Sequence, residues 1–153
     1  AMIKILEFYH IPVPKEVNNH PETVYHVKNK KLMNLYSQFF IETDCKQKEY
    51  FFKRGFNQAD ANEFKIGSDG DKLVFPLIDY NNRVVGFTRR TIRDETPKYI
   101  HSGSSEGFIK SEFLYNINKL NLSNHTVYIT EGTLDVISGM KYGITNILAC
   151  LDS

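Results

Sequence analysis

The chain has 153 residues, of which 41% are hydrophobic and 24% charged, and this composition is typical of a globular domain rather than a disordered segment. No stretch approaches the roughly 18 consecutive apolar residues that a membrane span needs, and the N-terminus lacks the pattern of a secretion signal. We therefore expect a cytoplasmic protein without a membrane partner. The net charge of +1, from 19 basic and 18 acidic residues, argues neither for nor against nucleic acid.

Arginine and cysteine are unevenly distributed. Four of the five arginines fall within residues 83–93, and arginine is the side chain best suited to bidentate phosphate contacts. The two cysteines, Cys45 and Cys150, lie far apart in the chain and form no Cys-x-x-Cys pair. We therefore expect no zinc in this chain and a reducing compartment.

The first part of the chain predicts a linker followed by helices. Residues 1–27 contain three prolines and an Asn-Asn-His stretch, which favours a linker or docking segment. From Lys30 to Phe40 the apolar residues recur with the helical period, so we expect a helix there.

Two further helices are expected before the pattern changes. Asp44 is a candidate N-cap with Gln47 as its capping-box partner, and the helix that follows would end at Gly55. Asn57 would cap a short helix that ends near Glu63. The aromatic residues of this region are interpreted as core.

A β-hairpin follows. Leu73–Ile78 and Val84–Ile92 read as antiparallel strands joined by a turn at 79–82, where asparagine tolerates positive φ. Pro76 would lie at an edge or a bulge because it cannot donate to the ladder. On one face of the returning strand, the residues that precede the arginine have small side chains. This pattern predicts room for a ligand on that face. That face carries Gly86, Thr88 and Arg90.

The middle of the chain reads as a long polar connection and a helix. Residues 94–107 are polar, and a loop of this length is more often functional than idle. Phe108–Leu120 returns to helix-like spacing. Its expected core residues are Phe113, Leu114 and Ile117.

The end of the chain predicts a strand–helix–strand unit. Val127–Thr130 alternates as a strand, a helical stripe runs through 134–140 to Gly143, and Ile144–Leu151 suits a buried parallel strand. The expected fold is therefore α+β: N-terminal helices with an antiparallel hairpin, followed by an incomplete βαβ unit. Because one such unit leaves its sheet unfinished, we expect a piece of a longer polypeptide.

Glu131 and Asp135 are the candidate metal ligands. Glu131 stands at the carboxyl end of a predicted parallel strand, just before Gly132, where ligands bind in open α/β sheets. Asp135 lies one helical turn on, and paired carboxylates suit Mg²⁺. The alternative is that Glu131 is a solvated strand end and Asp135 complements the helix dipole.

Arg90, Lys98 and Lys110 flank the polar connection and form the candidate phosphate-binding wall. Positive side chains there would hold a triphosphate or a nucleic-acid backbone. The alternative is an ordinary solvated basic face. Tyr99, beside Lys98, is expected to be exposed and able to stack on bases.

The ordered motifs from residue 52 to residue 136 resemble those of bacterial DnaG-type DNA primases. The resemblance is carried by Val-Gly-Phe-Thr-Arg-Arg at 85–90, Pro-Lys-Tyr at 97–99 and Phe-Ile-Lys at 108–110. The stretches at 52–56, 64–67 and 114–115 add to it, and Glu-Gly-Thr-Leu-Asp at 131–135 resembles the opening of the family's Toprim domain. This implies a primase-core N-terminal subdomain at 28–122 and a truncated Toprim domain start at 123–153.

The resemblance implies synthesis of short RNA primers on single-stranded DNA from ribonucleoside triphosphates, with a replicative helicase as partner. It assigns Glu131 to catalysis and, with Asp135, to Mg²⁺ or Mn²⁺, with further metal ligands expected beyond residue 153. It assigns Arg90, Lys98 and Lys110 to the nucleotide or template strand. The expected location is a bacterial host cytoplasm.

Two departures suggest a divergent, phage- or mobile-element-encoded member. Thr88-Arg89 stands where the family often has two small residues, and Asp152-Ser153 stands where Gly-Thr is usual. Because the remaining metal ligands are missing, the fragment is expected to be inactive alone. The alternatives are a Toprim-type nuclease or topoisomerase fragment, and a non-catalytic module that binds single-stranded DNA or a helicase.

Overall fold

The computed structural model describes residues 45–103 and 108–151. The expected linker at 1–27, the expected helix at 30–40 and the proposed cap Asp44 lie outside these residues. In the described part, no helix has the length and apolar character needed to cross a membrane.

Two short helices open the described chain. Helix α3 (Lys46–Lys53) has Cys45 as its N-cap, without a side-chain capping bond. The expected capping role of Gln47 is wrong, since its amide donates to the carbonyl of Gly70 on the neighbouring hairpin. Helix α4 (Gln58–Glu63) begins at Asn57 as predicted, with a complete capping box formed with Asp60.

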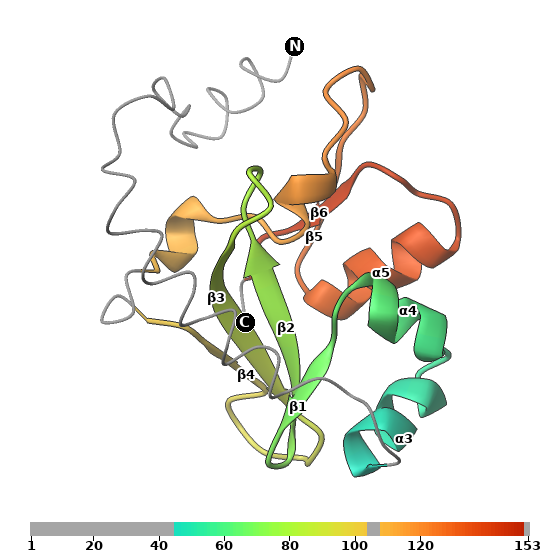
Figure 1. Ribbon diagram of the computed structural model, residues 1–153, viewed down its shortest axis with the longest axis vertical. Helices are drawn as coiled ribbons and strands as arrows, with labels where there is room; N and C mark the ends of the chain where they lie inside the picture. The colour runs from blue at the N-terminus through green and yellow to red at the C-terminus, as the bar shows by residue number, and fades with distance from the viewer. Residues whose placement is uncertain (1–44, 104–107, 152–153) are drawn as a thin grey trace.

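A four-stranded antiparallel sheet forms the centre of the molecule, in the order β1-β2-β3-β4 (Figure 1). The expected hairpin is confirmed as β2 and β3, with a turn in which Asn82 adopts a φ of 60°. Pro76 lies beyond the part of β2 that pairs with β1. The absence of an N–H on Pro76 therefore costs the sheet no hydrogen bond. The strands are β1 (Gly67–Asp69), β2 (Lys72–Ile78), β3 (Val84–Thr91) and β4 (Tyr99–His101).

The polar connection and the segment after it differ from the prediction. Tyr99–His101 is a strand that pairs with β3, so the segment 94–107 is not a continuous loop. The expected helix at 108–120 is wrong: two 3₁₀ turns occupy it, η3 (Lys110–Glu112) and η4 (Ile117–Lys119). An α-helix is interrupted because Asn116 is left-handed (φ 69°) and Tyr115 pairs with Ala149 through backbone hydrogen bonds. These two residues are buried, whereas the expected core residues of this stretch are half-buried.

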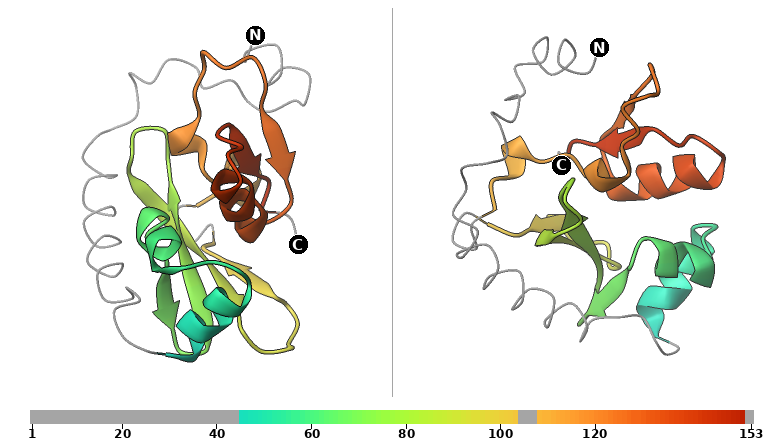
Figure 2. Two further views of the ribbon diagram at one scale, coloured as in Figure 1. Left: turned by 90° about the vertical axis from the view of Figure 1, so that its right-hand side faces the viewer. Right: turned by 45° about the horizontal axis from the view of Figure 1, so that its top comes forward.

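A parallel strand–helix–strand unit closes the described chain, as predicted. Strand β5 (Tyr128–Thr130) leads into helix α5 (Thr133–Lys141), and strand β6 (Ile147–Ala149) pairs parallel to β5. Gly143 ends the helix with a φ of 89°. Figure 2 shows this unit beside the four-stranded sheet, with α5 facing α4.

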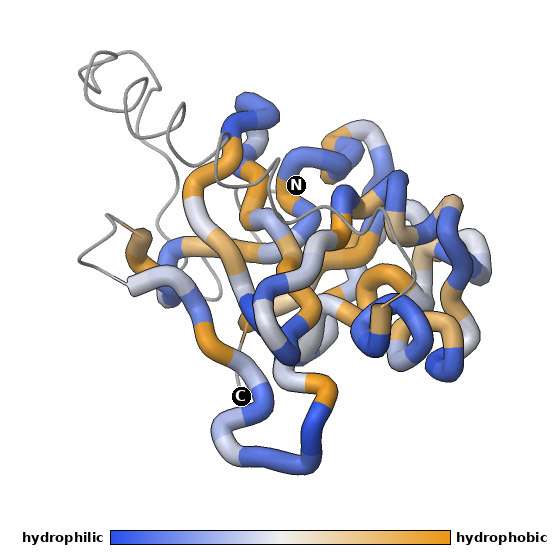
Figure 3. Tube along the Cα trace, turned by 60° about the horizontal axis from the view of Figure 1, so that its bottom comes forward, coloured by the Kyte–Doolittle hydropathy of each residue, from blue (hydrophilic) through white to orange (hydrophobic). Residues whose placement is uncertain are grey.

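One hydrophobic core joins the two sheets. Its largest cluster combines buried residues of the first part, such as Phe51 and Phe75, with Ile137 and Ile147 of the second. In Figure 3 hydrophobic residues concentrate on the central strands, while the excursion between β3 and β4 is mostly hydrophilic. At the surface, Lys141 of α5 donates to the carbonyl of Gly55 (2.5 Å) and pairs with an α4 carboxylate, so both parts are held together.

Candidate functional site

The two candidate metal ligands occupy the expected strand end. Glu131 follows β5 directly and is exposed, Gly132 is the N-cap of α5, and Asp135 is exposed in the first turn. A Cβ placed on Gly132 would lie 3.2 Å from Oδ2 of Asp135, so the carboxylate lies against the glycine. The two carboxylates therefore leave the same turn, at the carboxyl edge of β5.

Arg90 is a buried cation. Only 8% of it is exposed, and its guanidinium lies between the rings of Tyr50 and Tyr99, at 5.2 and 5.4 Å from their centroids. Its Nε donates to the Tyr99 hydroxyl (3.1 Å), and its Nη1 donates to the Tyr50 hydroxyl and to the carbonyl of Thr91. Among the described residues no carboxylate pairs with it. A buried charge without a counter-charge is costly, so this site favours an anion.

Tyr99 connects the buried arginine to the turn at Gly132. Its hydroxyl lies 3.7 Å from the position that a Cβ on Gly132 would occupy. The expectation of an exposed stacking platform is wrong, since Tyr99 is half-buried and its ring packs against Arg90. Strand β4 provides this placement by pairing Tyr99 with Arg90 in the ladder. The two predicted groups of site residues thus meet through a tyrosine.

His101, on β4, and Lys110, in η3, lie next to this part of the site. His101 exchanges a hydrogen bond with the Thr88 hydroxyl (2.8 Å between Nδ1 and Oγ1), and its ring stacks beside that of Tyr99. Burial, and after it the nearby positive charge of Lys110, lowers the pKa of His101 below its ordinary value. Burial first, and the charge of Lys110 second, thus favour the neutral form of His101.

Two buried polar atoms of the described residues have no hydrogen-bond partner. They are Nε2 of His101 and Oγ1 of Thr133. Buried polar atoms are nearly always satisfied, and exceptions call for an explanation such as a bound ion or water. His101 lies two residues after Tyr99 and Thr133 directly after Gly132, so both flank the candidate site.

The other predicted features of the site make fewer contacts or differ from the prediction. Lys98 is exposed, and neither its side chain nor that of Glu131 makes a hydrogen bond or ion pair with the described residues. The predicted room for a ligand on the face of Gly86 is wrong. A Cβ there would lie 3.1 Å from Ser102 and 3.3 Å from the ring of Phe108, so protein side chains fill this space.

The described residues offer part of a metal site. No cluster of three or more histidine, cysteine, aspartate or glutamate side chains occurs in the described ranges. The pair formed by Glu131 and Asp135 nevertheless has the oxygen donors that Mg²⁺ and Mn²⁺ prefer, and both are exposed at one turn. These two residues therefore fit a divalent cation as partial ligands.

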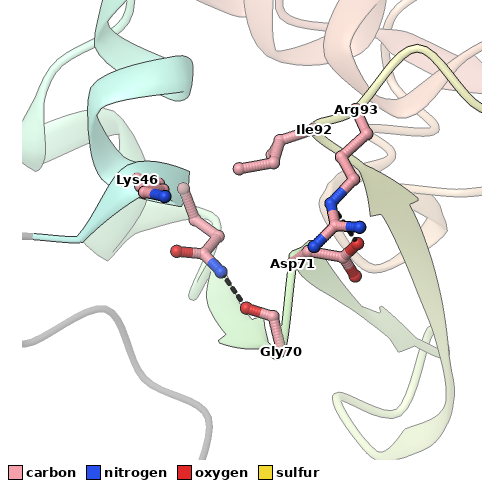
Figure 4. Close-up of a pocket in the computed structure, with 6 residues that line it drawn as sticks. Lys46, Gly70, Asp71, Ile92 and Arg93 are labelled. Carbon is pink, nitrogen blue, oxygen red and sulfur yellow. Dashed lines mark hydrogen bonds and ion pairs between the residues drawn. The ribbon is translucent and has the colours of Figure 1, made fainter.

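A separate hollow of about 710 Å³ lies between α3 and the β1–β2 turn (Figure 4). It is lined by Lys46, Gln47, Gly70, Asp71, Ile92 and Arg93. Two of its charged side chains pair with each other, since Arg93 contacts Asp71 at 3.0 Å. A hydrogen bond from Lys72 lowers the pKa of Asp71, so this carboxylate stays ionised within its ion pairs. Asp71 and Arg93 of this hollow are therefore already engaged with each other.

Tyr50 and His101 are site residues that sequence reasoning missed. Tyr50 was interpreted as core, and nothing local indicates that its partner lies forty residues away on β3. His101 had a usable signal: once Tyr99–His101 is read as a strand, residues two apart share one face.

The fold is that of the DnaG primase catalytic core. A solved DnaG primase catalytic domain bound to single-stranded DNA superposes with a TM-score of 0.70 at 21% identity, over 86% of this chain and 57% of that one. The RNA polymerase domain of Mycobacterium tuberculosis primase with double-stranded DNA gives 0.72 at 19% identity, over 84% and 55%. At these identities the likeness establishes the fold.

The sequence comparisons identify the domain. Residues 70–121 match the model of the DNA primase catalytic core, N-terminal domain. The DNA primase of Clostridium acetobutylicum is 30% identical over 83% of this chain and 30% of its own length. The chain therefore carries a DnaG-like primase catalytic-core N-terminal domain and has DNA primases as homologues. It spans less than a third of the length of that curated relative.

Proposed function

We propose that this segment serves a DNA primase that makes short RNA primers on single-stranded DNA by metal-dependent nucleotidyl transfer. The main support for this proposal is the buried charge of Arg90. Arg90 donates to the hydroxyl of Tyr99, and this hydroxyl lies next to the turn that carries Glu131 and Asp135. Phosphoryl transfer depends mainly on positioning and on neutralising charge, and a buried cation beside two carboxylates suits that demand. The DNA primase homologues support the same activity.

Each predicted residue receives a role in this proposal. Glu131 and Asp135 hold Mg²⁺ or Mn²⁺ together with ligands from outside the described residues, and the ion supplies Lewis-acid stabilisation of the phosphoryl oxygens. Glu131 is the proposed catalytic residue. Lys98 and Lys110 contact nucleotide or template phosphates, and Arg90 adds a third positive charge behind them.

The proposed partners are single-stranded DNA, ribonucleoside triphosphates and a replicative helicase. Relatives have been solved with single- and double-stranded DNA, which supports a DNA template for this chain. We propose the bacterial cytoplasm as the location, since a primase works where the chromosome is copied. A phage or mobile-element origin stays a prediction.

The proposed domain division separates the two sheets. Residues 28–122 would form the N-terminal subdomain of the primase core and residues 123–153 the start of a Toprim domain. The parallel order of β5 and β6 supports this division. Since Glu131 and Asp135 alone make an incomplete metal site, the segment by itself is not expected to make primers.

The test is primer synthesis by a full-length protein that carries this segment, with Mg²⁺ or Mn²⁺ on a single-stranded template. Glu131→Gln keeps the shape of the side chain and removes its charge, so we expect a loss of about 100-fold or more, the usual effect of removing one charge-stabilising group. Lys98→Ala should also reduce product. Glu112→Gln, at an exposed glutamate of η3, is the matched control and should keep wild-type activity.

The outcomes separate the alternatives. Full activity of Glu131→Gln would remove Glu131 from the mechanism. Cleavage of DNA without primer synthesis would favour the Toprim nuclease or topoisomerase interpretation. DNA binding without either activity, in a folded protein supplied with its helicase, would favour a non-catalytic binding module.

A further inference from the structure

Two arginines and two tyrosines of the first part of the molecule contact one another in alternation. The guanidinium of Arg54 lies 5.1 Å from the ring centroid of Tyr50, and Arg90 lies between Tyr50 and Tyr99. These four residues, named here the cation–tyrosine stack, come from α3 and the adjoining turn, β3 and β4. The stack fixes the ring of Tyr99 from behind, because Arg90 is buried and cannot move independently.

The hydroxyl of Tyr99 is oriented by its partner. Arg90 donates to this oxygen at 3.1 Å, so the hydroxyl acts as an acceptor on that side. A phenol that accepts a hydrogen bond keeps its own proton to donate elsewhere. Its free side meets the turn of α5, where Asp135 Oδ2 and Tyr99 Oη lie 3.2 and 3.7 Å from the position that a Cβ on Gly132 would occupy. A carboxylate is an acceptor only, so it matches the proton that Tyr99 can offer.

We propose that Tyr99 is a positioning residue for the Asp135 carboxylate. Held by Arg90, it donates its hydroxyl proton toward Asp135 and so fixes the orientation in which that carboxylate receives a divalent cation. The identity of the ligand rests on the proposed function. Groups that orient metal ligands commonly affect metal affinity by 10- to 100-fold when they are removed, so loss of one hydroxyl is measurable. In this arrangement Arg90 acts on the metal site through Tyr99.

Gly132 is part of the same arrangement of Arg90, Tyr99 and Asp135. A Cβ at this position would lie 3.2 Å from Asp135 Oδ2, which is tighter than ordinary van der Waals contact. A larger residue here would require the carboxylate to shift by a few tenths of an ångström. Gly132 therefore allows the two side chains to converge.

The experiment measures Mn²⁺ binding to the full-length protein by the decrease of the free Mn²⁺ signal in electron paramagnetic resonance. Tyr99→Phe keeps the ring against Arg90 and removes only the hydroxyl. We expect its Mn²⁺ dissociation constant to rise about tenfold, while its affinity for a single-stranded oligonucleotide changes less than twofold. Lys98→Ala should show the opposite split, with weaker oligonucleotide binding and unchanged Mn²⁺ affinity. Tyr80→Phe, at the exposed turn of the hairpin, is the matched control for loss of a phenol hydroxyl.

Two results would overturn the inference. One is an Mn²⁺ affinity of Tyr99→Phe equal to that of Tyr80→Phe; the other is a wild-type protein without saturable Mn²⁺ binding. If Tyr99→Phe fails to fold, Arg90→Lys takes its place, because it keeps the charge and loses the Nε donor; the same rise in the dissociation constant is expected. Failure of the proposed function looks different: wild type binds Mn²⁺, and Tyr99→Phe weakens it, but no primers form.

Discussion

At the scale of single residues, the environment of Arg90 separates it from the other predicted basic residues. Lys98 is exposed, whereas Arg90 is enclosed by two tyrosine rings and a backbone carbonyl. The alternation of β3 predicts that Arg90 shares a face with Thr88, and the register confirms this, because Leu73 and Phe75 lie opposite the two. The enclosure itself comes from Tyr50 on α3, a contact that no local pattern could indicate.

His101 gives a prediction about pH. Burial and then Lys110 lower its pKa from 6.5, so between that lowered value and 6.5 the folded state binds fewer protons than the unfolded state. The free energy of unfolding should therefore fall as the pH drops through this interval. His101→Asn removes this titration, so its urea-unfolding free energy should fall less steeply than that of wild type between about pH 7 and pH 5.

The control for the pH series is His125→Asn, at an exposed histidine in the loop before β5. It should keep the wild-type slope. Equal slopes for wild type and His101→Asn would contradict the burial argument.

At the scale of elements, the sequence predicted best those features whose interacting residues lie close together in the chain. The turn of the β2–β3 hairpin and the cap of α4 are both formed by side chains within four residues, such as Asp79 with Arg83. Strand β4 and the 3₁₀ segment were missed because each is determined by a distant strand. Tyr99–His101 is a strand only because β3 lies beside it, and Tyr115 leaves the helical path to pair with Ala149.

The cap of α4 gives a stability prediction. Asn57 accepts from the N–H of Asp60 at 3.0 Å, and Asp60 accepts from the N–H of Asn57 at 2.8 Å. Asn57→Ala removes half of this capping box and should lower the free energy of unfolding by about 1 kcal/mol, as measured by urea denaturation. Asn62→Ala, near the other end of the same helix, leaves the box intact and should cost less. An equal loss in both variants would show that the cap is not the cause.

At the scale of the whole molecule, the two sheets share one core although the proposed domain boundary falls between them. Sequence periodicity predicted the β2–β3 hairpin and the later parallel unit, but not the edge strands β1 and β4. Periodicity does not show that Phe51 and Ile137 belong to one cluster. It also predicted open space over Gly86, where Phe108 reaches that glycine from a segment well beyond the hairpin. The candidate site lies across this junction: Arg90 and Tyr99 come from one sheet and Asp135 from the unit of the other.

A shared core predicts cooperative unfolding. Ile137 on α5 is fully buried, so Ile137→Ala should lower the free energy of unfolding by about 2–5 kcal/mol. Amide hydrogen exchange should then show lower protection in β2 and β3 as well as in β5 and β6. The exposed Tyr142 (82%) serves as the control, and Tyr142→Ala should leave protection unchanged. Loss of protection confined to β5 and β6 would indicate two independent units.

The burial of Arg90 has a consequence for how the site responds to ionic strength. Dissolved salt screens charges that face the solvent, with a Debye length of about 8 Å at physiological concentration, and screens enclosed charges much less. Lys98 is open to that screening, whereas Arg90 is shielded by tyrosine rings. The attraction of Lys98 for an anion should therefore weaken at high salt concentration, whereas that of Arg90 should persist. An anion attracted by Lys98 would then be retained by Arg90.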